Sequence, residues 1–134
     1  MLTEKPTLTL AAAKKIIAAA EAEALKHTWP VVIAVVDDGG NLICLQRLDN
    51  AQFGSVDIAI QKAKSAVAFK RPTKAWEELL TSGQQRVLGL PGVLPSEGGV
   101  PLAWKGQIIG AIGVSGVKAN EDGQIARAGA SVLA

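Results

Sequence analysis

The sequence predicts an α+β fold in which amphipathic helices cover an antiparallel β-sheet. Two regions each have the pattern of two short strands joined by a turn, and helical patterns precede, separate and follow them. Hairpins make neighbouring strands antiparallel, so the helices must cover the faces of the sheet that the strands form. This order disfavours a parallel, doubly wound sheet. The length of 134 residues and the 49% of hydrophobic residues indicate a single domain spanning residues 1–134.

The first predicted element is an amphipathic helix from Thr9 to His27. Thr7 or Thr9 is suited to cap its start, and Pro30 prevents it from continuing. His27 follows Ala20 by seven residues, almost two full turns, and is therefore expected to extend the apolar stripe. That stripe consists of Leu10, Ala13, Ile16, Ile17, Ala20 and Ala24.

The next segment has the pattern of a β-hairpin. Val31–Val36 is a nearly continuous β-branched run, and Leu42–Leu48 is a second apolar run. Between them, Asp37–Asn41 is dense in residues that favour turns. The two strands are therefore expected to pair through a short loop.

Two helices are predicted after this hairpin. Ser55 is suited to cap the first, which Pro72 stops, and Thr73 starts a shorter helix that ends near Gly83. Lys62 is expected to lie off the apolar face of the longer helix. That face is formed by Val56, Ala59, Ile60, Ala63, Ala66 and Val67.

The final third of the chain predicts a long loop, a second hairpin and a last helix. Gln84–Gly99 has no periodicity and is the loop, a place where functional residues often lie. Val100–Trp104 and Gln107–Ser115 have the pattern of paired strands. Asn120 is suited to cap the last helix, whose inward residues are expected to be Ile125, Ala128 and Val132.

Composition narrows the classes of function. A net charge of +2 and an aromatic content of 4% are untypical of a nucleic-acid or membrane-surface protein. The single cysteine forms no intrachain disulfide, and the first residues lack a secretion signal, so the expected location is the cytoplasm. The 22 alanines and 14 glycines, with only 19% charged residues, indicate a surface partly covered by other copies. We therefore expect a homo-oligomer.

His27 and Asp37 have competing interpretations. His27, the only histidine, could be an axial haem ligand, another metal ligand or a general base, or it could simply complement the dipole at the end of a helix. Asp37 could transfer a proton, but formation of the turn also explains it. One histidine without a cysteine pair excludes a structural zinc site.

Basic residues are concentrated around the end of the second helix. They would suit the carboxylates of a substrate or the propionates of haem, although cations at a helix end also complement its dipole. Arg71 is the most interesting of them, because it precedes Pro72 and the start of the next helix, whose amides favour anions. The set comprises Lys62, Lys64, Lys70, Arg71 and Lys74.

Glu97 is the best-placed carboxylate in the long loop. It is followed by Gly98 and Gly99, which allow backbone conformations that other residues avoid and could also line a ligand site. Glu97 could act as a base or a hydrogen-bond acceptor at a cleft. Alternatively, it could be an exposed residue at a bend.

The sequence resembles the GlcG/HbpS-like haem-binding family, which includes the C-terminal domains of PduO-type proteins. The resemblance extends from Leu8 to the last helix, and the order and spacing of its segments carry it. Those segments are Val35–Leu42, Ser55–Thr73, Glu97–Leu102, Gly110–Gly116 and Glu121–Asp122.

The resemblance implies a profilin-like fold with helices on both sides of an antiparallel sheet, assembled as a tetramer or octamer. It also implies a haem or tetrapyrrole site formed by the first helix and the long loop, with His27 as ligand and Lys70 or Arg71 near the propionates. The alternative is a catabolic enzyme or accessory protein for a carboxylate metabolite, in which Arg71 holds the acid and Glu97 or Asp37 transfers a proton. A structural or assembly role without ligand chemistry is the third possibility.

Overall fold

The computed structural model describes residues 1–134 and contains one four-stranded antiparallel sheet. The strand order is β2-β1-β4-β3, so the two central strands come from different hairpins. This architecture confirms the predicted α+β class. The strands are β1 (Val32–Asp37), β2 (Leu42–Arg47), β3 (Gly99–Trp104) and β4 (Gln107–Ser115).

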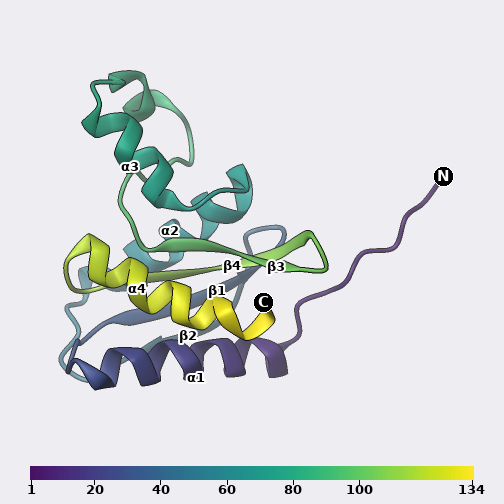
Figure 1. Cartoon of the computed structure of the whole chain (residues 1–134), viewed down its shortest axis with the longest axis horizontal. Coiled ribbons are helices and arrows are strands. Elements are labelled where there is room, and N and C mark those ends of the chain that lie inside the picture. Colours follow the sequence, from purple (N-terminus) through teal and green to yellow (C-terminus); the bar gives the residue numbers. More distant parts are fainter.

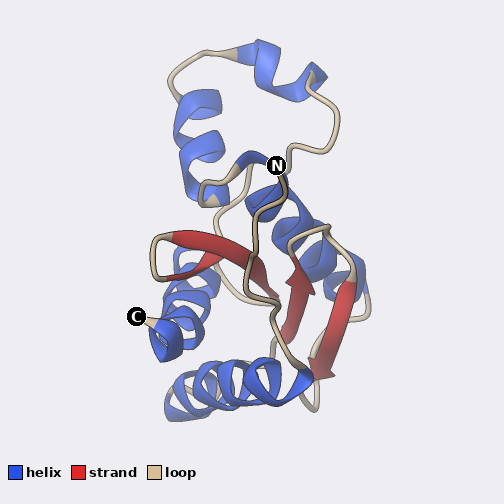
Figure 2. Ribbon diagram, turned by 90° about the vertical axis from the view of Figure 1, so that its right-hand side faces the viewer, coloured by secondary structure: helices blue, strands red, loops and turns tan.

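Helices cover the two faces of this sheet, giving three layers (Figures 1 and 2). α1 (Leu10–Lys26) and α4 (Ala119–Ala130) lie side by side on one face, and α2 (Gly54–Phe69) lies on the other. The central strands β1 and β4 contribute apolar residues to the packing on both faces of the sheet, because successive side chains of a strand point to opposite faces. The layered arrangement that the resemblance implies is therefore present.

The two helical layers are packed differently. Isoleucine and valine fill much of the layer beneath α1 and α4. Alanines of α2 lie against the opposite face, where the backbones approach so closely that a Cβ on Gly113 would lie 2.0 Å from the Ala59 carbonyl oxygen. Gly113 is thus needed for α2 to reach the sheet.

A smaller helical segment projects from the layered body (Figures 1 and 2). It contains α3 (Thr73–Thr81) and a 3-10 helix, η1 (Gln85–Gly89), which lies within the segment predicted to be a loop without regular structure. A second 3-10 helix, η2 (Ser131–Leu133), follows α4 near the C-terminus. The N-terminal residues extend away from the body (Figure 1). None of the helices combines the length and apolar character that a membrane span requires.

Two of the predicted helix caps are wrong. Thr9 caps α1 as expected, accepting a hydrogen bond from the Ala12 amide at 3.1 Å. Ser55 instead lies inside α2, with its hydroxyl directed inward to Ser115. α4 begins before Asn120, because the Glu121 carboxylate accepts the amide of the preceding Lys118 and stabilises an earlier start.

The predicted apolar faces are correct in their centres but not at their ends. Leu10 and Val132 were expected inside, and both are exposed. Leu10 is the first residue of α1, and Val132 follows α4 in η2, so neither continues the buried stripe of its helix. Ile125 is fully buried as predicted, whereas Ala128 is only partly buried.

Candidate functional site

A buried ion pair joins α2 to the start of α4. The Lys62 ammonium lies 3.1 Å from Asp122 Oδ2 and donates a second hydrogen bond to the Val114 carbonyl at 3.0 Å. Both side chains are about 3% exposed. The Asp122 carboxylate also accepts the Val117 amide. Burial raises the pKa of Asp122, and the neighbouring Lys62 charge and the hydrogen bonds oppose that increase.

The burial of Lys62 corrects its predicted place off the apolar face. Lys62 follows Ala59 by three residues and precedes Ala66 by four, which places it on the inward stripe of α2. Asp122 precedes Ile125 by three residues and likewise lies on the inward face of its helix, α4. The sequence signal for this pair was a basic residue on the inward stripe of one helix and an acidic residue on that of another. Because the Lys62 ammonium is bonded to Asp122 and to the Val114 carbonyl, it is not free to bind a ligand.

The glycines after Glu97 are required by the close approach of Lys62. A Cβ on Gly98 would lie 2.8 Å from Lys62 Nζ, and one on Gly99 would lie 2.3 Å from the Lys62 carbonyl oxygen. The Gly99 amide donates to the buried Thr73 hydroxyl at 2.8 Å, which fixes the start of β3 against the start of α3. This contact explains both glycines without a direct role in ligand binding.

Glu97 is buried beside the first turns of α4 rather than exposed at a bend. Its carboxylate accepts a hydrogen bond from Arg127 at 2.9 Å, and only 7% of the side chain is exposed. A Cβ on Gly123 would lie 2.0 Å from Glu97 Oε2, so the glycine makes room for the carboxylate. The backbone amide of Glu97 donates to Glu77, which ties the end of the long loop to α3.

These contacts border a cleft between the start of α3, β3 and α4. The cleft has a volume of about 280 Å³ and contains one acidic and two basic side chains. We call it the α3–α4 cleft. It is lined by Pro72, Lys74, Glu97, Gly99, Val100 and Arg127.

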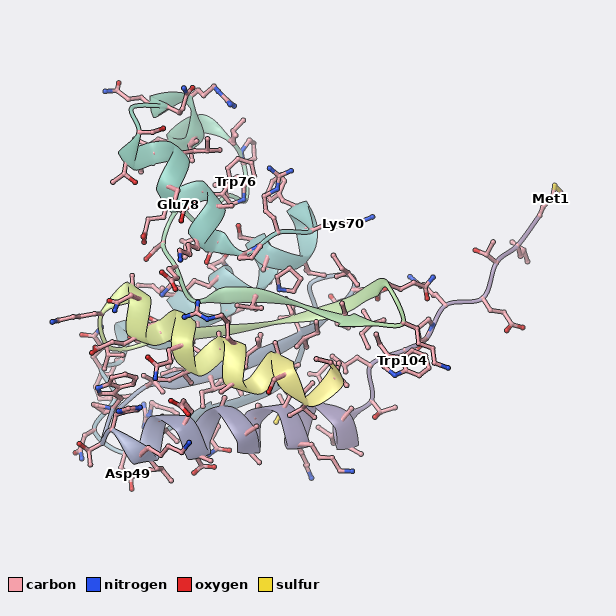
Figure 3. All side chains as sticks on the ribbon, in the orientation of Figure 1. Met1, Asp49, Lys70, Trp76, Glu78 and Trp104 are labelled. Atoms are coloured by element: carbon pink, nitrogen blue, oxygen red, sulfur yellow. The ribbon has the colours of Figure 1, made fainter.

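Arg71 and Lys70 do not line this cleft. The Arg71 Nε donates to the Phe69 carbonyl at 3.1 Å, and its guanidinium lies over the Trp76 ring, 4.7 Å from the centroid. Lys70 ends α2 in a left-handed conformation and projects away from α3 and α4 (Figure 3). The arginine beside Glu97 is Arg127, which lies outside the predicted basic set.

His27 belongs to a polar cluster at the far end of α1. The helix ends at Lys26, and His27 turns away from the apolar stripe that it was expected to extend, with 38% of its side chain exposed. Its Nε2 lies 3.2 Å from the Glu23 carboxylate, and its ring stacks on Trp29 with centroids 4.1 Å apart. The pKa of Glu23 is lowered by hydrogen bonds from Gln124, His27 and Lys26.

Asp37 organises the turn of the first hairpin. One of its carboxylate oxygens, Oδ1, accepts the backbone amides of Gly39 and Asn41, each at 2.9 Å. The Asn41 bond, followed by the Gly39 bond, lowers the pKa of Asp37. A lowered pKa makes a carboxylate a weaker base, so this geometry supports the turn interpretation over proton transfer.

Replacing Asp37 with Ala is expected to lower the free energy of unfolding by about 1 kcal/mol at neutral pH, because two amides lose their acceptor. The folded-state pKa of Asp37 is lowered, so its contribution is present above the usual aspartate pKa of about 3.9 and is lost as the pH falls through the folded value. Urea unfolding of both proteins at pH 7 and pH 3 measures the difference. An equal difference at both pH values would contradict this role.

Comparison with known proteins places the chain among relatives that resemble it along most of its length. The family model "Haem degrading protein HbpS-like" matches residues 8–131. The chain is 44% identical over 111 residues to Protein GlcG from Escherichia coli K12, a match that covers 83% of each chain.

Solved structures also resemble the chain along most of its length. A double mutant of Streptomyces reticuli HbpS superposes with a TM-score of 0.89 at 40% identity, covering 99% of this chain and 91% of that one. The structure described as a PduOC:haem complex gives a TM-score of 0.85 at 26% identity, covering 96% of each chain. The family match and these shared folds agree with the residue segments that carried the resemblance. This chain belongs to the HbpS-like family.

Proposed function

We propose that this chain forms a cytoplasmic homo-oligomer that binds haem or a related tetrapyrrole. The observation that carries the proposal is the HbpS-like match over residues 8–131, together with the similarity to the PduOC:haem complex along 96% of both chains. The catabolic enzyme acting on a carboxylate, which was the alternative, is not favoured by these comparisons. Its expected acid-binding residue, Arg71, is also separated from Glu97.

The dimensions of the clefts support a site completed by another copy. The clefts of a single chain have volumes of about 180 to 350 Å³. Pockets for drug-sized ligands have volumes of about 300 to 1,000 Å³ and bury most of the ligand surface. The five clefts lie below this range or at its lower end, so a second copy could supply the further surface that covers a flat macrocycle. Exposed apolar side chains such as Leu25, Phe53 and Leu88 offer surface that a second copy could cover.

His27 is our proposed axial ligand. It adjoins a cleft of about 350 Å³ whose apolar lining includes Leu25, Trp29 and Leu48. Histidines that bind metals commonly donate their second ring N–H to a carboxylate. A proton on Nε2, directed at Glu23, would leave Nδ1 unprotonated and able to coordinate iron. Stacking on Trp29 would limit rotation of the ring.

Expression with iron and a haem precursor is expected to yield a coloured protein that carries haem. Size-exclusion chromatography with light scattering is expected to place the haem in a species whose mass is a multiple of 13.8 kDa. His27→Ala should lose the haem or change its absorption spectrum, because the ligand is removed. Gln124→Ala is the matched control, since it removes a contact of the same cluster and keeps the imidazole.

Each outcome bears on a separate part of the proposal. A colourless wild-type protein would contradict haem binding. An unchanged spectrum in His27→Ala would retain haem binding and exclude His27 as the ligand. Haem confined to a 13.8 kDa monomer would contradict the shared site.

A further inference from the structure

We propose that the free edge of β2 pairs antiparallel with the β2 edge of a second copy of this chain, so that the two sheets join across a two-fold axis. The inference rests on the homo-oligomer of the proposed function. It names the surface through which two copies meet and the orientation in which they do so.

The outer edge of β2 has no partner within the chain. β2 is the terminal strand of the sheet and pairs with β1 only. The Leu48 amide donates to the Val31 carbonyl, on the side of β1. Successive residues of an antiparallel strand direct their backbone groups to opposite sides, so Arg47 and Leu45 direct theirs to the free edge. Leu45 lies near the middle of the strand, and an antiparallel pair centred on it uses these groups in both copies.

The composition of β2 leaves this edge open to another strand. Leu42–Gln46 contains neither a charged residue nor a proline, and four of its five residues are apolar. Charged residues and proline are the usual protection of a free edge against pairing. Beside this edge, Leu42 is 48% exposed and Phe53 is 79% exposed. A second copy at this edge would cover apolar surface as well as pair the backbone.

The opposite edge of the sheet is protected, which favours a closed pair of chains. Both edge strands contain a bulge, but only β3 also contains a proline, Pro101. Proline has no N–H to donate and is found in strands where the edge is not extended. Two open edges would allow copies to add without limit. A sheet that can extend at one edge only joins two copies and then closes.

The position of Arg47 selects the antiparallel orientation. It is the only charged residue of β2 and lies at the end of the strand. A parallel pair would place the two Arg47 side chains next to each other, and like charges directly opposite destabilise a sheet. In an antiparallel pair centred on Leu45, each Arg47 is two residues from the axis, so their Cα atoms lie about 14 Å apart along the strands.

The antiparallel pair also brings the second copy to the cleft beside His27. Leu48, Asp49 and Asn50 line that cleft and directly follow β2. In an antiparallel pair, the end of one strand lies beside the start of the other. The first hairpin of the second copy would therefore border the cleft, which gives the shared haem site of the proposed function a specific partner surface.

Light scattering of the full chain after size-exclusion chromatography tests the proposal. Leu45→Lys places two positive charges together at the centre of the pair, so the mass of the assembly should fall to half of the wild-type value or less. Leu45 is only partly buried, and a lysine there can direct its amine to solvent within one chain. Circular dichroism checks that the variant is folded.

Two variants control for the substitution itself. Leu45→Met introduces an unbranched side chain at the same position without the charge and should keep the wild-type mass. Ala103→Lys adds the same charge at an exposed position of the other edge strand, β3, and should also keep that mass.

Disulfide cross-linking measures the contact directly. In a Cys44→Ser background, Leu45→Cys places two thiols at opposite positions of the pair, where Cα atoms about 5.5 Å apart lie within disulfide range. Mild oxidation should link most chains as dimers on non-reducing electrophoresis. Ala103→Cys in the same background is the control and should remain unlinked. This measurement keeps the test valid if Leu45→Lys fails to fold.

Either of two results would overturn the proposal. These are a wild-type mass in folded Leu45→Lys, and no more linked dimer in Leu45→Cys than in Ala103→Cys. With an oligomeric wild type, they would exclude this surface and leave the proposed function intact. A monomeric wild-type protein would instead contradict the homo-oligomer of the proposed function, and this inference with it.

Discussion

Replacing Lys62 with Met is expected to lower the free energy of unfolding by about 3–5 kcal/mol, the usual result of leaving a buried charge without its partner. Asp122 would remain in a site where its side chain is about 3% exposed, and the Val114 carbonyl would also lose its donor. Urea unfolding monitored by circular dichroism measures the loss.

Two further variants separate the ion pair from other effects of the substitution. Lys64→Met makes the same chemical change at an exposed position of α2 and should alter stability by no more than about 0.5 kcal/mol. Adding Asp122→Asn to Lys62→Met removes the isolated charge but keeps an acceptor for the Val117 amide, so part of the stability should return. Equal stabilities for Lys62→Met and Lys64→Met would contradict the buried pair.

Replacing Gly113 with Ala is expected to lower the free energy of unfolding by about 3 kcal/mol or more, at the upper end of the usual range for overpacking. The new Cβ would lie 2.0 Å from the Ala59 carbonyl oxygen and 2.7 Å from the Ala63 amide nitrogen. These are backbone atoms of α2, so no side chain can rotate to relieve the collision. The helix would have to move away from the sheet.

Gly89→Ala provides the control for this second prediction. A Cβ at Gly89 meets no atom within 4 Å, so the same change should have little effect there. Thermal unfolding of the two variants and the wild type makes the comparison. A Gly113→Ala protein as stable as Gly89→Ala would show that α2 does not depend on this close approach.

The layers of the fold could be predicted because each follows from a local pattern. The β-branched run before Asp37 and the turn after it specify the first hairpin, and the three- and four-residue spacing of apolar residues specifies α1 and α2. The Thr9 cap was predicted because its bond to Ala12 spans only three residues. The predicted start of α4 was wrong because the Glu121 carboxylate accepts the Lys118 amide, so that Lys118 and not Asn120 is the N-cap.

The arrangement of the candidate site could not be predicted in the same way, since it depends on contacts between distant segments. Lys62 and Asp122 are 60 residues apart. Glu97 was singled out correctly as a carboxylate held at a cleft, but its partner, Arg127, is 30 residues further along the chain. A basic residue on an exposed helix face has no local feature that distinguishes a ligand-binding role from a solvated one.

The contacts of Arg71 could not be predicted from its place in the sequence either. The sequence places it beside Pro72 and the start of α3, which suggested an anion site there. In the structure, its guanidinium lies over the Trp76 ring, and Arg71 does not line the α3–α4 cleft. Two other basic residues, Lys74 and Arg127, line the α3–α4 cleft. Of the predicted basic set, Lys74 lines this cleft, and Arg127 lies outside that set.

Titration of the haem-free protein with hemin, followed by absorbance in the Soret region, tests the central claim most directly. The family membership and the proposed shared site predict saturation at a fixed ratio of haem to chain, in a species heavier than one 13.8 kDa subunit. Absorbance that rises linearly with hemin and never saturates would contradict the claim that this protein binds haem.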